Sequence, residues 1–451
     1  MVSPLRSTRL RRIIAAYTVN RLGTWFGFVA LSVTVFDQTK SAPAVAALLL
    51  SGQVLPAFVA PVVIARVEAS TRRGQLSWLY VLEGLLTTAL ALLILHFWLP
   101  GVLLLVALDG SAALAANGLL RAQAASAARA TVQQPAAGTS EADAAEQAQA
   151  AERAANAALN VAFSATFALG PAVAGVLVAA AGAPAALFID AASFLICGTL
   201  LIDLQPYVEE AGERSVRARL HAARQHINDV PALRALLAIE AVALIFFEFA
   251  GPIEIVYAKS TLDAGDRGYG LLLAVWGVGV VVGSIIFARS ARRALGAMLS
   301  AGTLAIGLAY LGFAAAPSLA IACAAALLGG VGNGVQWASV VSAVQSLTPP
   351  HLLGRMMGAL ESLSAICPAV GLSLGGSLVA ISSARGAFVV GGVGAGVAAA
   401  GFLWLALGRL ERRPPTGGQT LAHAEHADRQ GRGGGVGEPA RAGAPTSIDV
   451  D

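Results

Sequence analysis

Charged side chains are scarce in this sequence. Asp, Glu, Lys and Arg make up 12% of its 451 residues, whereas 57% are hydrophobic and the mean hydropathy is +0.71. A soluble protein of ordinary composition carries roughly 25% charged residues. This deficit excludes an ordinary soluble domain and indicates a membrane protein.

Residue patterns that carry catalysis or hold metals are also missing. The three cysteines, Cys197, Cys323 and Cys367, lie in apolar stretches without the spacing of metal ligands or of a disulfide framework. The sequence has no phosphate-binding Walker loop, so ATP-driven transport would need a separate subunit. It has no Ser/His/Asp or Cys/His arrangement typical of a hydrolase. We therefore expect no enzymatic activity, no cofactor and no metal.

What the sequence does contain is twelve long apolar stretches. A membrane helix needs about 20 mostly apolar residues, because each residue advances about 1.5 Å through a hydrocarbon layer of roughly 30 Å. The predicted spans are Ile13–Asp37, Ala42–Val67, Leu76–Phe97, Gly101–Leu120, Ala158–Ala181, Pro184–Leu204, Ala235–Tyr257, Gly270–Ala288, Leu295–Ala316, Ala320–Val344, Met357–Ile381 and Ala387–Leu407.

Positive charge is concentrated in every second gap between these spans. Those gaps and the two ends hold 25 of the 30 Lys and Arg residues, and the other gaps hold only Lys40, Lys259, Arg267 and Arg385. Short basic loops stay in the cytoplasm, so both termini are predicted to be cytoplasmic in a multi-pass protein of a bacterial-type inner membrane. Because these loops explain the net charge of +4, we expect no nucleic-acid partner. The basic start runs into a span too long for a cleavable signal peptide.

The spans divide into two similar halves. Gly175–Ala179 in span five matches Gly376–Ala380 in span eleven, and an Ala-Arg pair followed by Arg-Arg comes after both span two and span eight. We expect an all-α membrane protein with twelve transmembrane helices in two six-helix pseudo-repeats. Its predicted parts are a cytoplasmic start (1–12), two halves (13–204 and 235–407), a cytoplasmic linker (205–234) and a disordered tail (408–451). A capping box at Ser140 and Asp143 predicts a short helix before span five.

Ionisable residues within the spans are the strongest indication of function. An unpaired charge in hydrocarbon costs several kcal/mol, so it needs a partner or a water-filled cavity. Span seven carries Glu240, Glu248 and Glu254 beside Gly251-Pro252. Glu248 lies near mid-membrane and is interpreted as a proton carrier or cation site, or else as a hydrogen-bonded acid. Glu240 and Glu254 lie nearer the ends and are expected to be solvated.

Other polar and flexible positions complete the candidate set. Pro252 removes a backbone hydrogen bond, which suits a bend in a moving helix. Gln53, Asn333 and Gln336 are uncharged polar residues that could line a cavity, and Gln53 and Gln336 could equally form interhelical hydrogen bonds.

The chain resembles the major facilitator superfamily, and more narrowly its bacterial branch of enterobactin exporters and macrolide-efflux proteins. The matching stretches are Asn20–Thr24, Ala155–Ala157, Gly170–Gly175, Phe188–Phe194, Tyr269-Gly270 with Gly277 and Gly279, Gln345 with Pro349, and Gly354-Arg355 with Gly371 and Gly375-Gly376. The resemblance covers residues 10 to 408 and implies spans one, four, seven and ten around a central cavity. Arg21 in span one could then pair with Asp109 in span four, or one of them could take the charge of a substrate or proton.

The resemblance also points to gating residues. After span two the family has a Gly-x-x-x-Asp-Arg-x-x-Arg-Arg latch. Here Glu68, Arg72 and Arg73 fit three of its charged positions, and Ile64 and Ala69 replace the Gly and the first Arg. Gly170 and Pro171 resemble the span-five motif of drug antiporters, and Arg355, from another matching stretch, is a further gating candidate. Gly251 and Pro252 are gating candidates because of the bend that the proline favours and not because of the resemblance.

Together these features predict a secondary transporter that works by alternating access. We expect a monomeric, proton-coupled exporter of small amphipathic compounds such as a drug, a siderophore or a secondary metabolite. Protonation of Glu248 or Asp109 would bias which side opens. An importer of the same fold and a non-transporting membrane scaffold are the alternatives, and mid-membrane acids argue against a scaffold.

Overall fold

The computed structural model describes residues 7–68, 74–131, 141–202, 224–290, 294–349 and 352–410. Helices account for nearly all of these residues. They are α1 (Thr8–Thr39), α2 (Ala42–Glu68), α3 (Gln75–Leu93) with η2 (Ile94–His96), α4 (Leu99–Ala130), α5 (Glu141–Ala181), α6 (Ala183–Leu200), α8 (Pro231–Glu248), α9 (Gly251–Val256) with η3 (Tyr257–Thr261), α10 (Gly265–Arg289), α11 (Leu295–Ala315), α12 (Leu319–Ser346), α13 (Leu353–Ile381) and α14 (Ala384–Leu405) with η5 (Ala406–Leu410).

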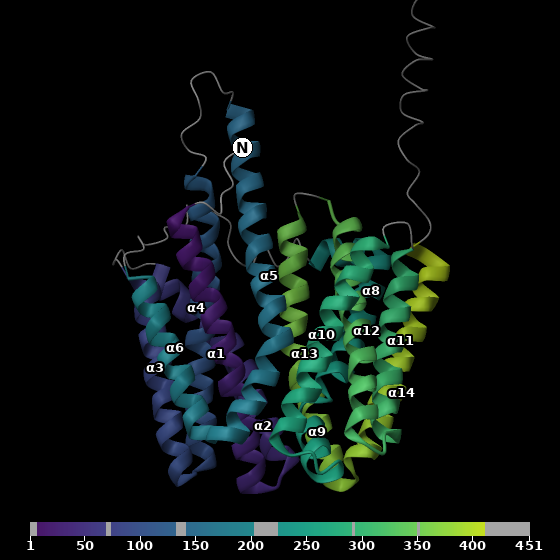
Figure 1. Cartoon of the computed structure of the whole chain (residues 1–451). Helices are drawn as coiled ribbons and strands as arrows, with labels where there is room; N and C mark the ends of the chain where they lie inside the picture. The colour runs from purple at the N-terminus through teal and green to yellow at the C-terminus, as the bar shows by residue number, and fades with distance from the viewer. Residues whose placement is uncertain are drawn as a thin grey trace, which may run out of the picture.

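The predicted all-α membrane fold is confirmed. Eleven helices of the described chain are long and apolar enough to cross a membrane, with α8, α9 and η3 forming one of them. The one remaining predicted span is span two, which corresponds to the 27-residue helix α2. Its first part, Ala42–Val54, is an apolar helix that is shorter than the other eleven. The helices run up and down in chain order, so that α1 begins and α14 ends at the upper end of the bundle (Figure 1).

Large apolar side chains cover the outside of the bundle. Leu85 of α3, Leu104 of α4 and Val393 of α14 are each about 60% exposed, as are many residues like them on other helices. In a soluble protein such patches would be covered, whereas lipid tails solvate them. Trp78 and Trp98 lie exposed near opposite ends of the α3 span, at the depth where aromatic side chains prefer the membrane interface.

Helices α1–α6 and α8–α14 form two halves that lie side by side and meet through a few helix pairs (Figure 1). Helix α5 packs against α10, and α2 packs against α13 and α9. At the first contact a Cβ built on Gly270 would lie 2.7 Å from the Cα atom of Gly175 and 2.7 Å from the carbonyl oxygen of Pro171. The absence of side chains at Gly175 and Gly270 therefore lets the backbones of the two halves touch near their lower ends.

Several helices differ from the sequence prediction at their ends, and α4, for example, ends at Ala130 and not at Leu120. Helix α5 begins at Glu141, 17 residues before the predicted start at Ala158, because the short helix expected before span five is continuous with it. The span-seven helix is broken between Glu248 and Gly251. Pro252 cannot donate a hydrogen bond to the carbonyl group of Glu248, so the helix is interrupted at this point. The loop of residues 69–73, most of the linker and the tail lie outside the described residues.

Candidate functional site

One cavity brings together four of the residues singled out in the sequence. It has a volume of about 310 Å³ and is lined by Glu240 and Glu248 of α8 and by Asn333 and Gln336 of α12. Further lining comes from α10, α11, α13 and α14, and from α5 of the other half. The cavity is thus formed mainly within the C-terminal half, and the N-terminal half closes one side of it.

Glu240 is the most deeply buried charged residue of this cavity. Its exposed fraction is 0%, which overturns the prediction that it is solvated near the end of the span. Gln336, itself 5% exposed, donates from Nε2 to Glu240 Oε2 at 2.7 Å, and no described group hydrogen-bonds Oε1. The prediction was wrong because distance along a helix does not reveal which side chains the neighbouring helices cover.

Glu248 lies at the end of α8, directly before the helix break. Its side chain is half-buried and lines the same cavity. Next to the break, the carbonyl oxygen of Phe247 accepts a hydrogen bond from the Tyr310 hydroxyl of α11 at 3.1 Å. Gly251 packs between the two halves, because a Cβ built there would lie 3.2 Å from Leu49 of α2 and from Leu372 of α13. The break therefore lies between a cavity carboxyl and a contact between the halves.

Aromatic side chains form much of the remaining wall. Phe163 and Phe167 come from α5, Phe247 from α8 and Trp337 from α12. The resemblance implied that spans one and four also line a central cavity, but α1 and α4 contribute none of the lining residues described. Helix α1 instead packs behind the α5 wall, where Trp25 meets Phe167 edge-on at a ring separation of 5.3 Å.

The possible ion pair between Arg21 and Asp109 is not formed. The Arg21 guanidinium lies over the Phe163 ring, 5.0 Å from its centroid. Asp109 accepts a long hydrogen bond of 3.5 Å from Thr87 of α3. Packing on α5 thus holds Arg21 away from Asp109.

Asp109 belongs to a group of three acids inside the N-terminal half. Glu83 of α3 and Asp190 of α6 are 1% and 4% exposed, and Glu83 is within electrostatic range of both Asp109 and Asp190. Glu83 Oε1 has no hydrogen-bond partner among the described groups, and Asp190 accepts from Ser193 at 3.5 Å. These acids are separate from the cavity lining.

The remaining candidates are spread over the molecule. Gln53 is exposed on α2 and does not line the cavity. Gly170 leaves space for Trp25, because a Cβ there would overlap the indole ring, and Pro171 is buried inside α5. The latch candidates Arg72 and Arg73 lie outside the described residues. Glu68 and Arg355 lie on α2 and α13, but their side chains are not described.

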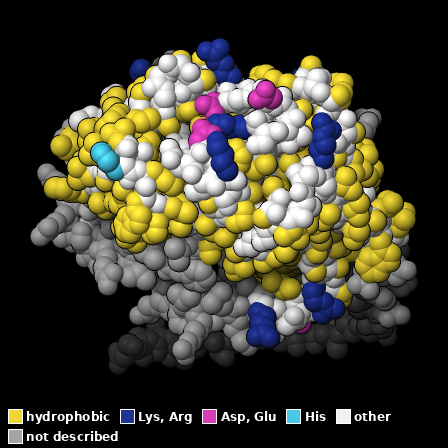
Figure 2. Space-filling view, turned by 90° about the horizontal axis from the view of Figure 1, so that it is seen from below, with side chains coloured by type: hydrophobic (Ala, Val, Ile, Leu, Met, Phe, Trp, Pro, Cys, Tyr) yellow, Lys and Arg dark blue, Asp and Glu magenta, His cyan; other side chains and the backbone are white. Residues whose placement is uncertain are grey.

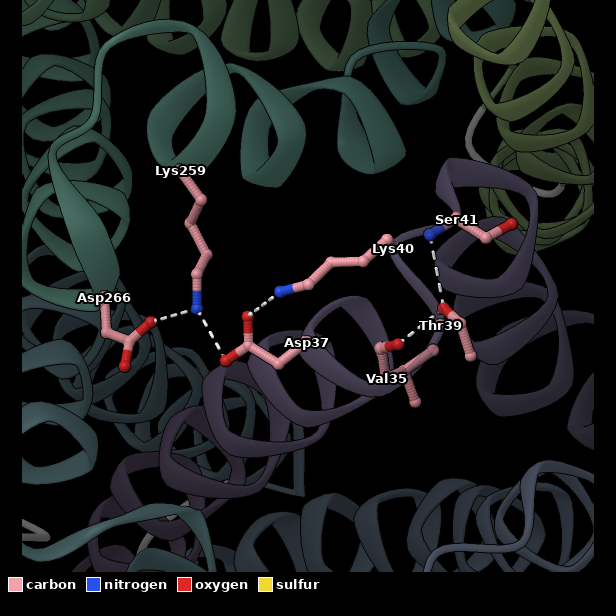
Figure 3. A network of polar contacts seen from close by, with 7 residues as sticks. All are labelled: Val35, Asp37, Thr39, Lys40, Ser41, Lys259 and Asp266. Atoms are coloured by element: carbon pink, nitrogen blue, oxygen red, sulfur yellow. Dashed lines mark hydrogen bonds and ion pairs between the residues drawn. The ribbon is translucent and has the colours of Figure 1, made fainter.

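At the lower end an ionic network joins the two halves (Figure 3). The Lys259 ammonium of η3 lies 2.8 Å from Asp37 at the end of α1 and 2.5 Å from Asp266 in the first turn of α10. Lys40 also contacts Asp37, at 3.3 Å. Viewed from below, acidic and basic side chains lie next to one another within a largely uncharged face (Figure 2). We call Asp37, Lys40, Lys259 and Asp266 the lower network.

This network is not among the sites predicted from the sequence. Lys40 and Lys259 are the only lysines of the sequence, and both occur in gaps that otherwise carry almost no positive charge. The rarity of lysine, and its place in these gaps, was a signal in the sequence that could have pointed to this network. The pairing itself was not visible, because Asp37 and Lys259 are 222 residues apart.

Known proteins share this architecture. Residues 236–437 match the model of the Major Facilitator Superfamily. The chain is 24% identical over 400 residues to the uncharacterised MFS-type transporter YfiS of Bacillus subtilis (strain 168). The aligned region covers 85% of this chain and 89% of the relative. These similarities support membership of the Major Facilitator Superfamily. The match to the narrower branch of enterobactin exporters and macrolide-efflux proteins stays a prediction.

Solved transporters have the same fold. The crystal structure of the nucleoside transporter NupG matches with a TM-score of 0.65 at 12% identity, over 88% of this chain and 99% of that chain. A bacterial homologue of the human lysosomal transporter Spinster, in an inward-facing and unoccupied conformation, matches with a TM-score of 0.64 at 12% identity, over 92% and 100%. At this identity the likeness shows the fold alone.

Proposed function

We propose that this protein is a proton-coupled secondary transporter that exports small amphipathic compounds. The observation that carries the proposal is the cavity containing Glu240 and Glu248, which lies in the C-terminal half against α5 of the other half. An apolar cavity of this kind with a few convergent polar groups is typical of small-molecule binding sites. A scaffold has no need for two carboxyl groups at such a position, since burying them opposes folding.

The proposed cycle uses the contacts between the halves as its moving parts. The lower network, the Gly175–Gly270 approach and the packing of α2 on α13 hold the lower ends together. The bias of positive charge toward the gaps predicted to be cytoplasmic supports a cytoplasmic position for the upper end, where α1 begins. We infer an inward-facing conformation, the state described for the similar Spinster homologue. Opening the lower end would require breaking the Lys259–Asp37 pair.

Proton coupling would operate at the cavity carboxyls. Burial in a low-dielectric site favours the neutral, protonated form of a carboxyl group, whereas access to water or to a cation favours the charged form. Glu248 borders the helix break, so a change in its protonation is placed to act on the bend that contacts Leu49 of the other half. Asp109 lies away from this cavity, which makes Glu248 the stronger candidate for the coupling residue.

The test is transport by wild-type protein and by Glu248→Gln in inside-out vesicles under an imposed proton gradient. We expect the wild type to move compounds from a panel of amphipathic drugs into the vesicles and Glu248→Gln to lose gradient-driven accumulation. Glu254→Gln is the matched control, because Glu254 is on the same span and does not line the cavity. Equal accumulation by Glu248→Gln would rule out its coupling role, uptake in the opposite sense would identify an importer, and no movement of any compound would favour a scaffold.

A further inference from the structure

The charge of the cavity lining is one-sided. Among its described lining residues are two carboxylic acids and no Lys, Arg or His. The Arg21 guanidinium lies over the ring of Phe163, 5.0 Å from its centroid, but Arg21 is not itself a lining residue. A ligand in the cavity therefore meets two acidic side chains and no basic lining side chain that could neutralise them.

Glu240 is arranged to accept one more partner. Its carboxyl group is fully buried, and Gln336 holds only Oε2, whereas Oε1 has no hydrogen-bond partner among the described residues. An unpaired buried carboxylate costs several kcal/mol, and that cost is removed either by a proton or by a cation in contact with the free oxygen. Gln336 fixes the orientation of the carboxylate through Oε2, which leaves the hydrogen-bonding capacity of the buried Oε1 unused.

The rest of the wall suits an aromatic or bulky apolar body. Phe163, Phe167, Phe247 and Trp337 all line the cavity. The faces of such rings are electron-rich and attract cations that lie within about 6 Å of the ring centroid. The same rings attract neutral ligands through apolar contact but offer no such gain to an anion.

A metal ion does not fit these observations. Within the described part of the chain no group of three His, Cys, Asp or Glu side chains could hold one. The cavity volume of about 310 Å³ is also that of a small organic ligand and not of a bare ion.

We propose that the cavity binds organic monocations that carry aromatic groups, with Glu240 Oε1 as the counter-charge and Gln336 as the group that orients it. This inference deepens the proposed function, on which it rests for the identity of the site. It excludes anionic compounds as preferred ligands and predicts that positive charge, at equal shape, decides affinity.

The experiment measures binding to the purified full-length protein in detergent, with no gradient present. Radiolabelled tetraphenylphosphonium and ethidium are the cationic probes in equilibrium dialysis, and triphenylphosphine oxide is the neutral competitor of similar shape. In the wild type we expect at least one of the cations to bind about tenfold more tightly than the oxide, which corresponds to about 1.4 kcal/mol.

The decisive measurement is the ratio of cation to neutral affinity in variants. Glu240→Gln keeps the size of the side chain, so it should bring the ratio close to one while affinity for the oxide changes little. Glu254→Gln should leave the ratio at the wild-type value. A merely structural role for Glu240 would lower both affinities together. The proposal is overturned if wild-type protein binds neither cation, or if it binds the oxide as tightly as both cations. It is also overturned if Glu240→Gln leaves the ratio of cation to neutral affinity unchanged.

Failure of this inference can be separated from failure of the proposed function. If the cations bind with the expected pattern but proteoliposomes move none of them, the ligand class stands and transport is disproved for these compounds. If proteoliposomes transport other compounds while cations bind no better than the oxide, only the ligand class is wrong.

Discussion

The Nζ atom of Lys259 lies 2.8 Å from Oδ2 of Asp37, and this pair ties the end of the first helix to the opposite half of the molecule. Lys259 is also bound to Asp266 within its own half. Its side chain is 14% exposed, so the pair is better shielded from solvent than an ordinary surface ion pair. One lysine thus links the N-terminal half to the first turn of α10.

Replacing this lysine should shift the balance between conformations. Lys259→Met removes the link across the halves and leaves two acids facing each other, so the lower end should open more often. An ion pair of this exposure contributes about 1 kcal/mol, or about a fivefold change in the equilibrium. Distances between spin labels placed on the lower ends of the two halves would measure the shift. Lys40→Met is the matched control, because Lys40 is 71% exposed and contacts Asp37 within the same half; an equal shift in both variants would contradict the assignment.

A disulfide across the halves should trap the closed lower end. A Cβ built on Gly376 of α13 lies 2.7 Å from Cβ of Ala46 on α2, and a disulfide needs about 3.8 Å, so only a small separation of the helices is required. In a background with Cys197, Cys323 and Cys367 replaced, Ala46→Cys with Gly376→Cys should cross-link under mild oxidation and stop transport, and reductant should restore it.

The control pair for this cross-link uses the same partner on α2. Leu374 lies on α13 but is 49% exposed, so Ala46→Cys with Leu374→Cys should remain uncross-linked. Transport that continues in the fully cross-linked Ala46/Gly376 pair would show that the lower end does not move.

The contact between Gly170 and Trp25 should be specific for glycine. A Cβ at Gly170 would overlap the indole ring of Trp25, so Gly170→Ala forces α1 and α5 apart at an expected cost of about 1–3 kcal/mol. The melting temperature of the purified protein measures this loss. Combining Gly170→Ala with Trp25→Leu should recover part of it, because the smaller side chain vacates the space; strictly additive losses would contradict the steric explanation.

Glu83 should be replaceable by its amide without loss of stability. Its Oε1 atom has no described partner, and Asp109 and Asp190 lie within electrostatic range. Glu83→Gln keeps the shape and removes a buried acid beside two others, so we expect the melting temperature at neutral pH to rise by about 2 °C or more. Glu254→Gln provides the comparison. A marked fall for Glu83→Gln would indicate that the acid has a partner or role in the cycle.

Much of the fold could be predicted from the sequence. The predicted span at Leu295–Ala316 differs from α11 by one residue, and Ala320–Val344 differs from α12 by one and two residues. Such accuracy is possible because lipid provides no hydrogen bonds, so every span must be an apolar helix of nearly fixed length. Polar extensions escape this rule, which is why the predicted span five left out the extension of α5 back to Glu141, although a short helix was predicted there.

The candidate site was predictable only in part. The cost of burying charge in hydrocarbon drew attention to Glu240, Glu248, Asn333 and Gln336, and all four line one cavity. The same argument did not reveal that Arg21 packs on Phe163 and leaves Asp109 unpaired with it. Rotation and tilt of neighbouring helices decide such pairings, and a single sequence does not encode them in any local pattern.

The sequence by itself determined that this is an all-α polytopic membrane protein and where its apolar helices lie along the chain, because hydrocarbon imposes a length and a polarity on each span separately. Only the tertiary structure decided which polar groups meet. Glu240 and Gln336 are 96 residues apart, and Asp37 and Lys259 are 222 apart. Their contacts depend on how whole helices pack, since a shift of one helix by a single residue turns each side chain by about 100° and would separate both pairs.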